Sequence, residues 1–216
     1  AVEFKKALED IRYEVKENNN GLFIDKIDDL IGRIDLFGIY FASLDIRQDS
    51  RILRDVHAYC RQQKPINSLY SEDYDSLSEE EKLKAISFRN AKIIYTDEQD
   101  DLVKDTLQTI NQIKEMQQSN GELACHRFII SNCQQASDIL QLMELFLWNG
   151  WEADELTIDF VPLFETVNDL SGAAEIMEKL YSHPFYKKHL ASRGGKQDIM
   201  LGFSDSTKDG GYLTAN

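Results

Sequence analysis

The sequence predicts an α/β fold that is rich in helix and holds about four parallel strands. Short apolar runs of strand length alternate with longer segments whose apolar residues recur at helical spacing. The short runs are apolar along most of their length, which is typical of strands buried in a parallel sheet. Each run also ends abruptly in polar residues, as strands do when they present side chains at the carboxyl edge of such a sheet.

Composition limits the class of protein. The 216-residue chain has a formal net charge of −14, so it lacks the basic surface that nucleic acids and anionic membranes attract. No apolar run reaches the roughly 18 residues of a membrane-spanning helix, and the first residues do not have the plan of a signal peptide. The three cysteines have neither disulfide parity nor metal spacing, which favours free thiols in a cytoplasmic protein.

The first third of the chain is predicted to begin with helices, which occupy residues 1–37. The stop signal Asn18-Asn-Asn-Gly21 separates two of them. A mostly apolar strand follows and ends before Arg47, and Asp49 or Ser50 can cap the helix after it. In chain order, these elements are a helix at 3–17, a helix beginning near residue 22, a strand at 38–46 and a helix at 51–63.

A polar, non-helical segment is predicted at residues 65–77 and begins at Pro65; the chain after it is predicted to be helical. Ser78-Glu-Glu-Glu81 has the spacing of a capping box and begins a helix that continues to about residue 92. Apolar residues at helical spacing indicate a long helix over 98–118.

The last part of the chain has the regular alternation of a parallel sheet. We therefore expect residues 38–216 to contain strands with crossover helices, and residues 1–216 to form a single fragment of a larger domain. In chain order, these last elements are a strand at 127–130, a helix at 135–148, a strand at 157–164, a helix at 170–182 and a strand at 198–203.

Two carboxylates are candidate metal ligands. Glu165 and Asp205 each follow a predicted strand, one strand–helix unit apart. Neighbouring parallel strands are about 4.8 Å apart, so the two carboxylates can converge on one hard cation such as Mg2+. The alternative is that each side chain merely caps the helix that follows it. Spacing alone leaves both interpretations open.

Two basic residues are candidate anion ligands. The planar fork of Arg47 can bind a phosphate or carboxylate, but the residues alone favour an ion pair with Asp45, Asp49 or a neighbouring strand's carboxylate. Lys208 lies near Asp205 and can steady an anion, or it can be a solvated surface lysine.

Several segments resemble phosphoenolpyruvate carboxylase in their residues, order and spacing. The most specific are Leu44-Asp-Ile-Arg-Gln48, Pro162-Leu-Phe-Glu-Thr166 and Phe203-Ser-Asp-Ser-Thr-Lys-Asp-Gly-Gly211. The other matching segments are 128–131, 136–140 and 194–197. The resemblance covers nearly the whole chain but only a central part of the family's longer polypeptide.

The resemblance implies a partial TIM-type barrel with roughly the first half of the barrel strands. It implies a carboxy-lyase that carboxylates phosphoenolpyruvate with bicarbonate to give oxaloacetate and phosphate, an anaplerotic carbon dioxide fixation that supplies the tricarboxylic acid cycle. Glu165 and Asp205 match the family's ligands for Mg2+ or Mn2+. Arg47 matches an arginine that holds the substrate phosphate, and Lys208 matches a lysine near the bicarbonate region. The parent enzyme is expected to be a cytoplasmic homotetramer.

The chain also departs from the family pattern. The family's upstream Thr-Ala-His-Pro-Thr-Glu and downstream His-Gly-Arg-Gly-Gly segments are absent, and Arg193-Gly-Gly195 has the wrong context to replace the latter. We therefore expect a fragment that is inactive by itself. The alternatives are a non-catalytic binding or assembly module, or another phosphoenolpyruvate-using barrel of the pyruvate kinase or phosphate dikinase type.

Overall fold

The computed structural model describes residues 2–89, 91–94 and 100–215. The chain divides into two compact units, one of Ala1–Leu44 with Glu115–Cys125 and one of Asp45–Lys114 with His126–Asn216. Among the described residues, no helix combines the length and apolar character needed to cross a membrane.

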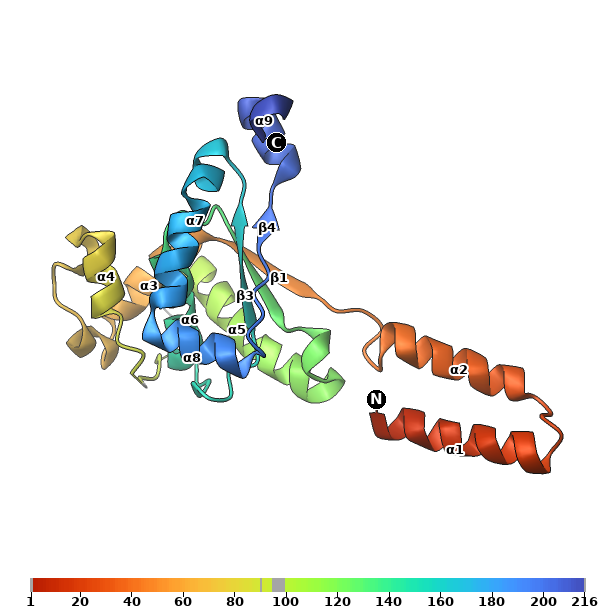
Figure 1. Cartoon of the computed structure of the whole chain (residues 1–216). Coiled ribbons are helices and arrows are strands. Elements are labelled where there is room, and N and C mark those ends of the chain that lie inside the picture. The colour runs from red at the N-terminus through yellow and green to blue at the C-terminus, as the bar shows by residue number, and fades with distance from the viewer. Residues whose placement is uncertain (1, 90, 95–99, 216) are drawn as a thin grey trace. The chain divides into compact units, whose positions relative to one another are not determined.

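The first unit contains a helical hairpin, as the sequence predicts. Helix α1 (Val2–Asn18) runs against α2 (Ile24–Phe37), and both are drawn in red to orange in Figure 1. Lys5 Nζ lies 2.6 Å from Asp35 Oδ1, and Arg12 pairs with Asp28. Because α1 has no buried residue, these exposed ion pairs are its most specific contacts with α2. The short helix η3 (Glu122–Ala124) also belongs to this unit.

The second unit is built on a four-stranded parallel sheet with the order β1-β2-β3-β4. The α/β class and the four parallel strands are therefore confirmed. The strands are β1 (Asp45–Asp49), β2 (Arg127–Ser131), β3 (Asp159–Phe164) and β4 (Met200–Leu201). In the register, Arg47 pairs with Ile129, and Ile129 pairs with Val161.

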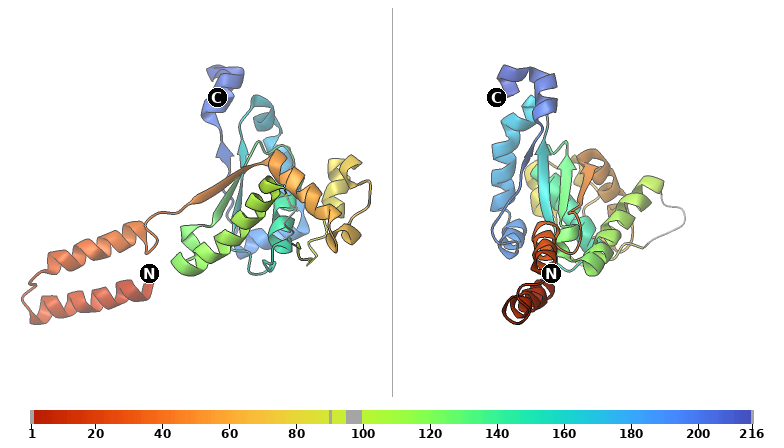
Figure 2. Two further views of the ribbon diagram at one scale, coloured as in Figure 1. Left: turned by 180° about the vertical axis from the view of Figure 1, so that it is seen from behind. Right: turned by 90° about the vertical axis from the view of Figure 1, so that its right-hand side faces the viewer.

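One face of the sheet packs on helices. Phe128 and Phe160 both meet the ring of Phe146 from α6 (Ala136–Trp148), and Phe160 also meets His189 from α8 (Pro184–Ser192). Every residue of α6 is buried, including the polar residues Asp138, Gln141 and Glu144, which all have hydrogen-bond or ion-pair partners. Figures 1 and 2 show α3 (Ser50–Gln62), α6 and α7 (Val167–Ser182) on the same side of the strands.

The prediction of a strand at residues 38–46 was wrong for most of its length. Gly38 and Phe41 both adopt left-handed backbone conformations, with φ of 58° and 63°, which an extended strand does not tolerate. The Phe41 ring instead stacks on Phe37. The strand begins at Asp45, so Arg47 lies inside β1 and not beyond its end. Asp49 caps α3, as one of the two predicted caps.

A buried carboxylate joins several segments in the second unit. Glu144 of α6 is fully buried, and its Oε2 lies 2.9 Å from His57 Nε2 of α3. Its Oε1 accepts hydrogen bonds from the Tyr70 hydroxyl and from the backbone N–H groups of Ser87 and Phe88. Tyr70 follows the short helix η1 (Ile66–Leu69), and η2 (Tyr74–Ser76) comes next along the chain.

This carboxylate also explains why a predicted helix is shorter than expected. The Ser78–Glu81 capping box is present and begins α4 (Glu79–Ala85), which ends well before residue 92. Ile86 is no longer helical, and the next two N–H groups bond to Glu144 and not to the preceding turn. A tertiary hydrogen bond therefore overrides helical propensity; residue 90 of the predicted helix lies outside the described residues.

The remaining predictions are largely confirmed, but three helices after residue 183 were missed. Helix α5 (Asp101–Asn120) corresponds to the helix predicted at 98–118, whose residues 98 and 99 lie outside the described residues. Helix α8 starts with Pro184 in its first turn, a position that proline favours. Residues 203–210, partly predicted as strand, form α9 (Phe203–Gly210), and α10 (Tyr212–Ala215) follows.

The last strand is shorter and more exposed than predicted. It lies at the edge of the sheet, and Leu201 is 64% exposed, so the expectation of a buried strand was wrong. The Phe160 carbonyl accepts from the Gln197 side-chain amide, and the Phe164 carbonyl accepts from the Gly202 N–H. The backbone groups of alternate residues of β3 therefore point toward β4. Pro162 belongs to this set and has no N–H to donate. The ladder to β4 therefore contains only two residue pairs.

Removal of the Glu144 carboxylate should destabilise the second unit strongly. Glu144→Ala leaves buried His57, the Tyr70 hydroxyl and two N–H groups without their acceptor, so we expect a loss of about 3–5 kcal/mol in the free energy of unfolding. Glu178→Ala, at an exposed position on α7, is the matched control and should change it by less than about 0.5 kcal/mol. Urea unfolding followed by circular dichroism measures both values. Equal effects would contradict this role.

His189 should make the fold sensitive to acid. Burial lowers the pKa of His189 from 6.5 to about 4, and its Nε2 bonds to the Ile158 carbonyl. As the pH falls through 6.5, the unfolded chain takes up a proton that the folded chain does not, so stability falls between pH 6.5 and 4. His189→Gln keeps an N–H donor but cannot titrate. Between pH 6.5 and 4, the unfolding free energy of His189→Gln should therefore fall less steeply than that of the wild type. The two slopes should differ by up to about 1.4 kcal/mol per pH unit, measured by urea titrations. Equal slopes would contradict the prediction.

Candidate functional site

The candidate residues gather at the carboxyl edge of the sheet in the second unit. All four strands run parallel, so their carboxyl ends meet at one edge. Glu165 follows β3 directly, and Ser131 is the last residue of β2. Asp205 lies in the first turn of α9, after β4, and Lys208 lies in its last turn. Arg47 approaches this edge from within β1.

Arg47 and Glu165 form a direct ion pair. Arg47 Nη2 donates to Glu165 Oε1 at 2.7 Å. Because β2 lies between β1 and β3, the arginine side chain spans the width of one strand to make this bond. The Arg47 side chain is 52% exposed and that of Glu165 is 20% exposed. The ion-pair role considered for Arg47 is therefore realised, with a carboxylate two strands away.

The second oxygen of Glu165 is also engaged. Its Oε2 accepts a hydrogen bond of 3.1 Å from the backbone N–H of Asn132, the residue after β2. Sequence reasoning missed Asn132. The available signal was an asparagine directly after a strand, because asparagine adopts the left-handed conformation more readily than most residues. Its φ here is 53°.

Neither carboxylate occupies the cap position of the following helix. Thr166 caps α7 and forms a reciprocal capping box with Asp169. The cap position of α9 is Gly202, three residues before Asp205. The Asp205 carboxylate instead lies 3.4 Å from Lys208 Nζ, and both side chains are more than half exposed. The described structure thus leaves Glu165 and Asp205 available for a role other than helix capping.

Helix α9 is held against the junction of β3 and α7. The Gly202 N–H donates to the Phe164 carbonyl at 2.8 Å, and Asp209 Oδ2 accepts from the Val167 N–H at 3.0 Å. A side chain at Gly202 would meet the Cα and Cγ atoms of Glu165 at 3.1 Å. The absence of a side chain therefore lets the chain between β4 and α9 approach the backbone of Glu165 closely.

The two carboxylates have the chemistry of ligands for a hard divalent cation. Mg2+ and Mn2+ prefer oxygen donors and commonly use one or two carboxylates completed by water and substrate oxygens. Among the described residues, no group of three or more His, Cys, Asp or Glu side chains is placed to hold a metal ion. Glu165 and Asp205 offer oxygen donors of this kind, and a cation at Glu165 would have to compete with Arg47 for the same carboxylate.

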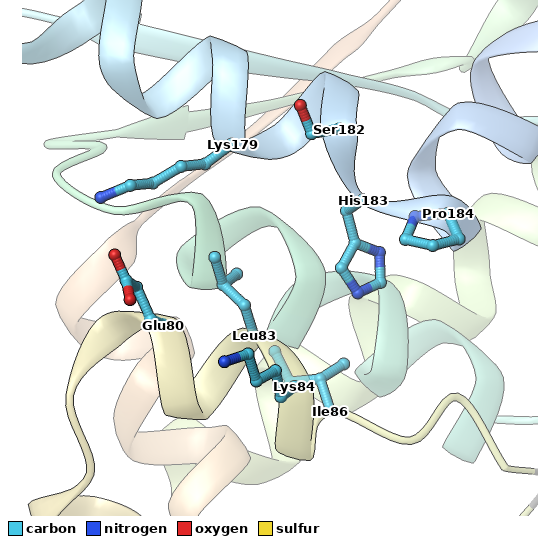
Figure 3. A pocket seen from close by; sticks show the side chains of 8 residues that line it. All are labelled: Glu80, Leu83, Lys84, Ile86, Lys179, Ser182, His183 and Pro184. Carbon is cyan, nitrogen blue, oxygen red and sulfur yellow. The ribbon is translucent and has the colours of Figure 1, made fainter.

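A separate cavity of about 460 Å³ lies between α4 and the junction of α7 and α8 (Figure 3). Leu83, Ile86 and Pro184 form its apolar part, and the His183 ring lies beside them. Its lining includes none of the residues at the carboxyl edge of the sheet. Burial lowers the pKa of His183, which favours the neutral ring. This cavity is therefore distinct from the candidate site.

Comparison with known proteins gives one consistent result. A sequence model of the family described as phosphoenolpyruvate carboxylase matches residues 1–216. The phosphoenolpyruvate carboxylase of Nitrosomonas eutropha is 34% identical over 214 residues, which cover 95% of this chain and 23% of the relative. Two phosphoenolpyruvate carboxylases from strains of Prochlorococcus marinus are 35% and 34% identical over 230 residues, covering 99% of this chain and 23% of each relative. The chain thus spans about a quarter of the length of these curated relatives.

Gly202 should tolerate a side chain poorly. In Gly202→Ala the new Cβ meets backbone and side-chain carbons of Glu165, so we expect a loss of about 1–3 kcal/mol in the free energy of unfolding. Gly172→Ala, inside α7, is the matched control, because no atom lies within 4 Å of its new Cβ. Better helix propensity should stabilise that variant by up to about 1 kcal/mol. Urea unfolding gives both values, and effects of the same sign would contradict the packing described.

Proposed function

The chain belongs to the phosphoenolpyruvate carboxylase family. On this basis we propose that it forms part of the active site of an enzyme that carboxylates phosphoenolpyruvate with bicarbonate. The products of this reaction are oxaloacetate and phosphate. The observation that carries the proposal is the Arg47–Glu165 pair at the carboxyl edge of the sheet, with Asp205 and Lys208 following the next strand. The proposed enzyme class is a carboxy-lyase acting in carbon dioxide fixation.

We propose that the sheet is part of a TIM-type barrel. Four parallel strands in sequential order, with helices packed on one face, support this architecture. In such a barrel the carboxyl ends of the strands form the mouth where catalysis takes place. Residues 1–216 are then one segment of the catalytic region, with the helices of 1–37 leading into the strands. The parent enzyme is proposed to be a cytoplasmic homo-oligomer, a tetramer by analogy with the family.

Arg47 is proposed to bind the phosphate group of the substrate. Its guanidinium is permanently charged and offers several N–H donors in a planar fork that matches phosphate oxygens. The side chain is half exposed, so a ligand at the edge of the sheet can reach it. Positioning and charge stabilisation are the main contributions that a protein makes to phosphoryl transfer, and a fixed arginine supplies both.

Glu165 and Asp205 are proposed to hold Mg2+ or Mn2+. When bound, such a cation supplies Lewis-acid stabilisation of negative charge that develops on a substrate oxygen. The Glu165 carboxylate is held at both oxygen atoms, by Arg47 and by the Asn132 N–H. Lys208, beside Asp205, is proposed to contribute positive charge near the bicarbonate. It therefore complements the anionic substrates at this edge of the sheet.

The experiment uses a chimera because the chain covers 23% of each relative. This chain replaces the matching segment of the Nitrosomonas eutropha relative, and oxaloacetate formation is followed by coupled NADH oxidation. We expect turnover that falls at least about a hundredfold in kcat/KM for Arg47→Gln, Glu165→Gln and Asp205→Asn. Arg51→Gln and Glu178→Gln, at exposed positions, should stay within about twofold.

The outcomes separate the proposal from its rival. A folded chimera without turnover would support a non-catalytic binding module. An active chimera whose three site variants behave like the two surface controls would contradict the assignment of these residues. Mn2+ binding to the isolated chain, measured by electron paramagnetic resonance, gives a second readout that does not depend on turnover.

A further inference from the structure

We propose that Ser50 is a positioning residue that fixes the Glu165 carboxylate through the backbone of Asn132. Among the described hydrogen bonds, Ser50 makes none to the Glu165 carboxylate itself. It bonds to the backbone of Asn132, whose N–H holds one of the carboxylate oxygens. The functional meaning rests on the proposed role of Glu165, whereas the link itself is a property of the folded chain.

The first step is the turn at Asn132. This residue follows β2 with a left-handed φ of 53°, and its N–H donates to Glu165 Oε2 at 3.1 Å. The hydrogen bond connects the end of β2 to the residue after β3. A left-handed residue directly after a strand redirects the next peptide groups, so the direction of this N–H depends on the turn remaining in place.

The second step is the bond that holds this turn from the other side. Ser50 is fully buried, and its Oγ donates to the Asn132 carbonyl at 2.6 Å. The N–H and the carbonyl of one residue belong to the two peptide planes that flank its Cα. Fixing both groups therefore restrains φ and ψ of Asn132 together. The restraint comes from the first residue of α3, directly after β1.

The third step sets the direction of the Ser50 hydroxyl. Arg54 Nη2 donates to Ser50 Oγ at 3.0 Å, and Arg54 Nε lies 3.3 Å from buried Asp138 Oδ1. A serine hydroxyl has a single hydrogen. Because Arg54 donates to the oxygen, that hydrogen is directed to the Asn132 carbonyl. A cationic donor on the oxygen also polarises the hydroxyl and strengthens the bond that it gives.

These bonds hold Glu165 at two points. One carboxylate oxygen accepts from Arg47 of β1, and the other accepts from Asn132 after β2. Two contacts on opposite oxygens fix the plane of the carboxylate, whereas one contact allows it to rotate. The peptide group between Asn132 and Cys133 has two bonds, the short one from Ser50 to its carbonyl and one of 3.3 Å from its N–H to the Leu163 carbonyl. Loss of the Ser50 hydroxyl removes the shorter bond and so loosens the second contact of Glu165, while the contact with Arg47 stays intact. The expected result is a misoriented Glu165 in a folded chain.

Amide hydrogen exchange of the complete 216-residue chain tests the link directly. In Ser50→Ala we expect the Asn132 amide to exchange at least about tenfold faster relative to the Ile130 amide of β2, approaching its rate in Glu165→Ala. Ser137→Ala is the matched control, because it removes an equally buried hydroxyl that donates to Glu79. It should leave the Asn132-to-Ile130 ratio unchanged. An unchanged ratio in Ser50→Ala overturns the inference.

A second pair of variants tests the turn without changing Ser50. Asn132→Gly keeps the N–H, the carbonyl and the left-handed conformation, so Glu165 should remain fixed. Asn132→Val keeps both groups but disfavours the left-handed conformation, because valine is branched at Cβ. If each variant folds, the Asn132-position amide should remain protected in the first and exchange faster in the second. Equal protection would contradict the proposed role of the turn.

Mn2+ titration connects the link to function. We expect Ser50→Ala and Asn132→Val to weaken Mn2+ binding several-fold, and Asn132→Gly and Ser137→Ala to leave it unchanged. If Glu165→Gln binds Mn2+ like the wild type, the metal role of Glu165 fails, and the exchange ratios still decide the positioning role. If Glu165→Gln loses Mn2+ while Ser50→Ala shows neither weaker binding nor faster exchange, the positioning inference alone fails.

Discussion

The fold of the second unit depends on an acidic side chain that is fully buried and hydrogen-bonded at both oxygens. The Glu144 carboxylate is fully buried and uses both oxygens, one toward His57 of α3 and one toward Tyr70 and the segment after α4. A buried carboxylate without such partners would be very unfavourable, so these segments are fixed relative to α6. Since α6 packs on β2 and β3 through Phe146, the same contacts support the edge of the sheet where Arg47 and Glu165 meet.

The sequence predicted those elements whose signals are local. The α6 helix, the capping box at Ser78 and the carboxylate after β3 were all identified, because apolar periodicity and capping chemistry involve near neighbours. The end of α4 and the start of β1 were not, since the first depends on Glu144 and the second on left-handed residues at Gly38 and Phe41. Tertiary hydrogen bonds and positive φ angles leave little trace in hydrophobic periodicity.

The sequence indicated which residues of the candidate site lie near the ends of strands, but not which of them bond to one another. Glu165 and Asp205 were identified from their places after strands, and Arg47 from its charge and the family resemblance. The direct bond between Arg47 and Glu165 reaches across β2, so it depends on sheet order and side-chain length. The role of Ser50 was missed because its partner is a backbone carbonyl 82 residues away. A hydroxyl that bonds to the main chain has no motif in the sequence.

Pro162 has a mechanical consequence for the site. It offers no N–H on the side of β3 that faces β4, and the seam between these strands contains only two residue pairs. Glu165 continues the chain on one side of the seam, and Asp205 follows on the other. The distance between the two carboxylates therefore depends on the shortest strand pairing in the described sheet. The hydrogen bonds of Gly202 and Asp209 add two further connections between the two sides. If the proposed cation binds both carboxylates, it links the segments after β3 and β4 and adds a connection where the sheet has only two residue pairs.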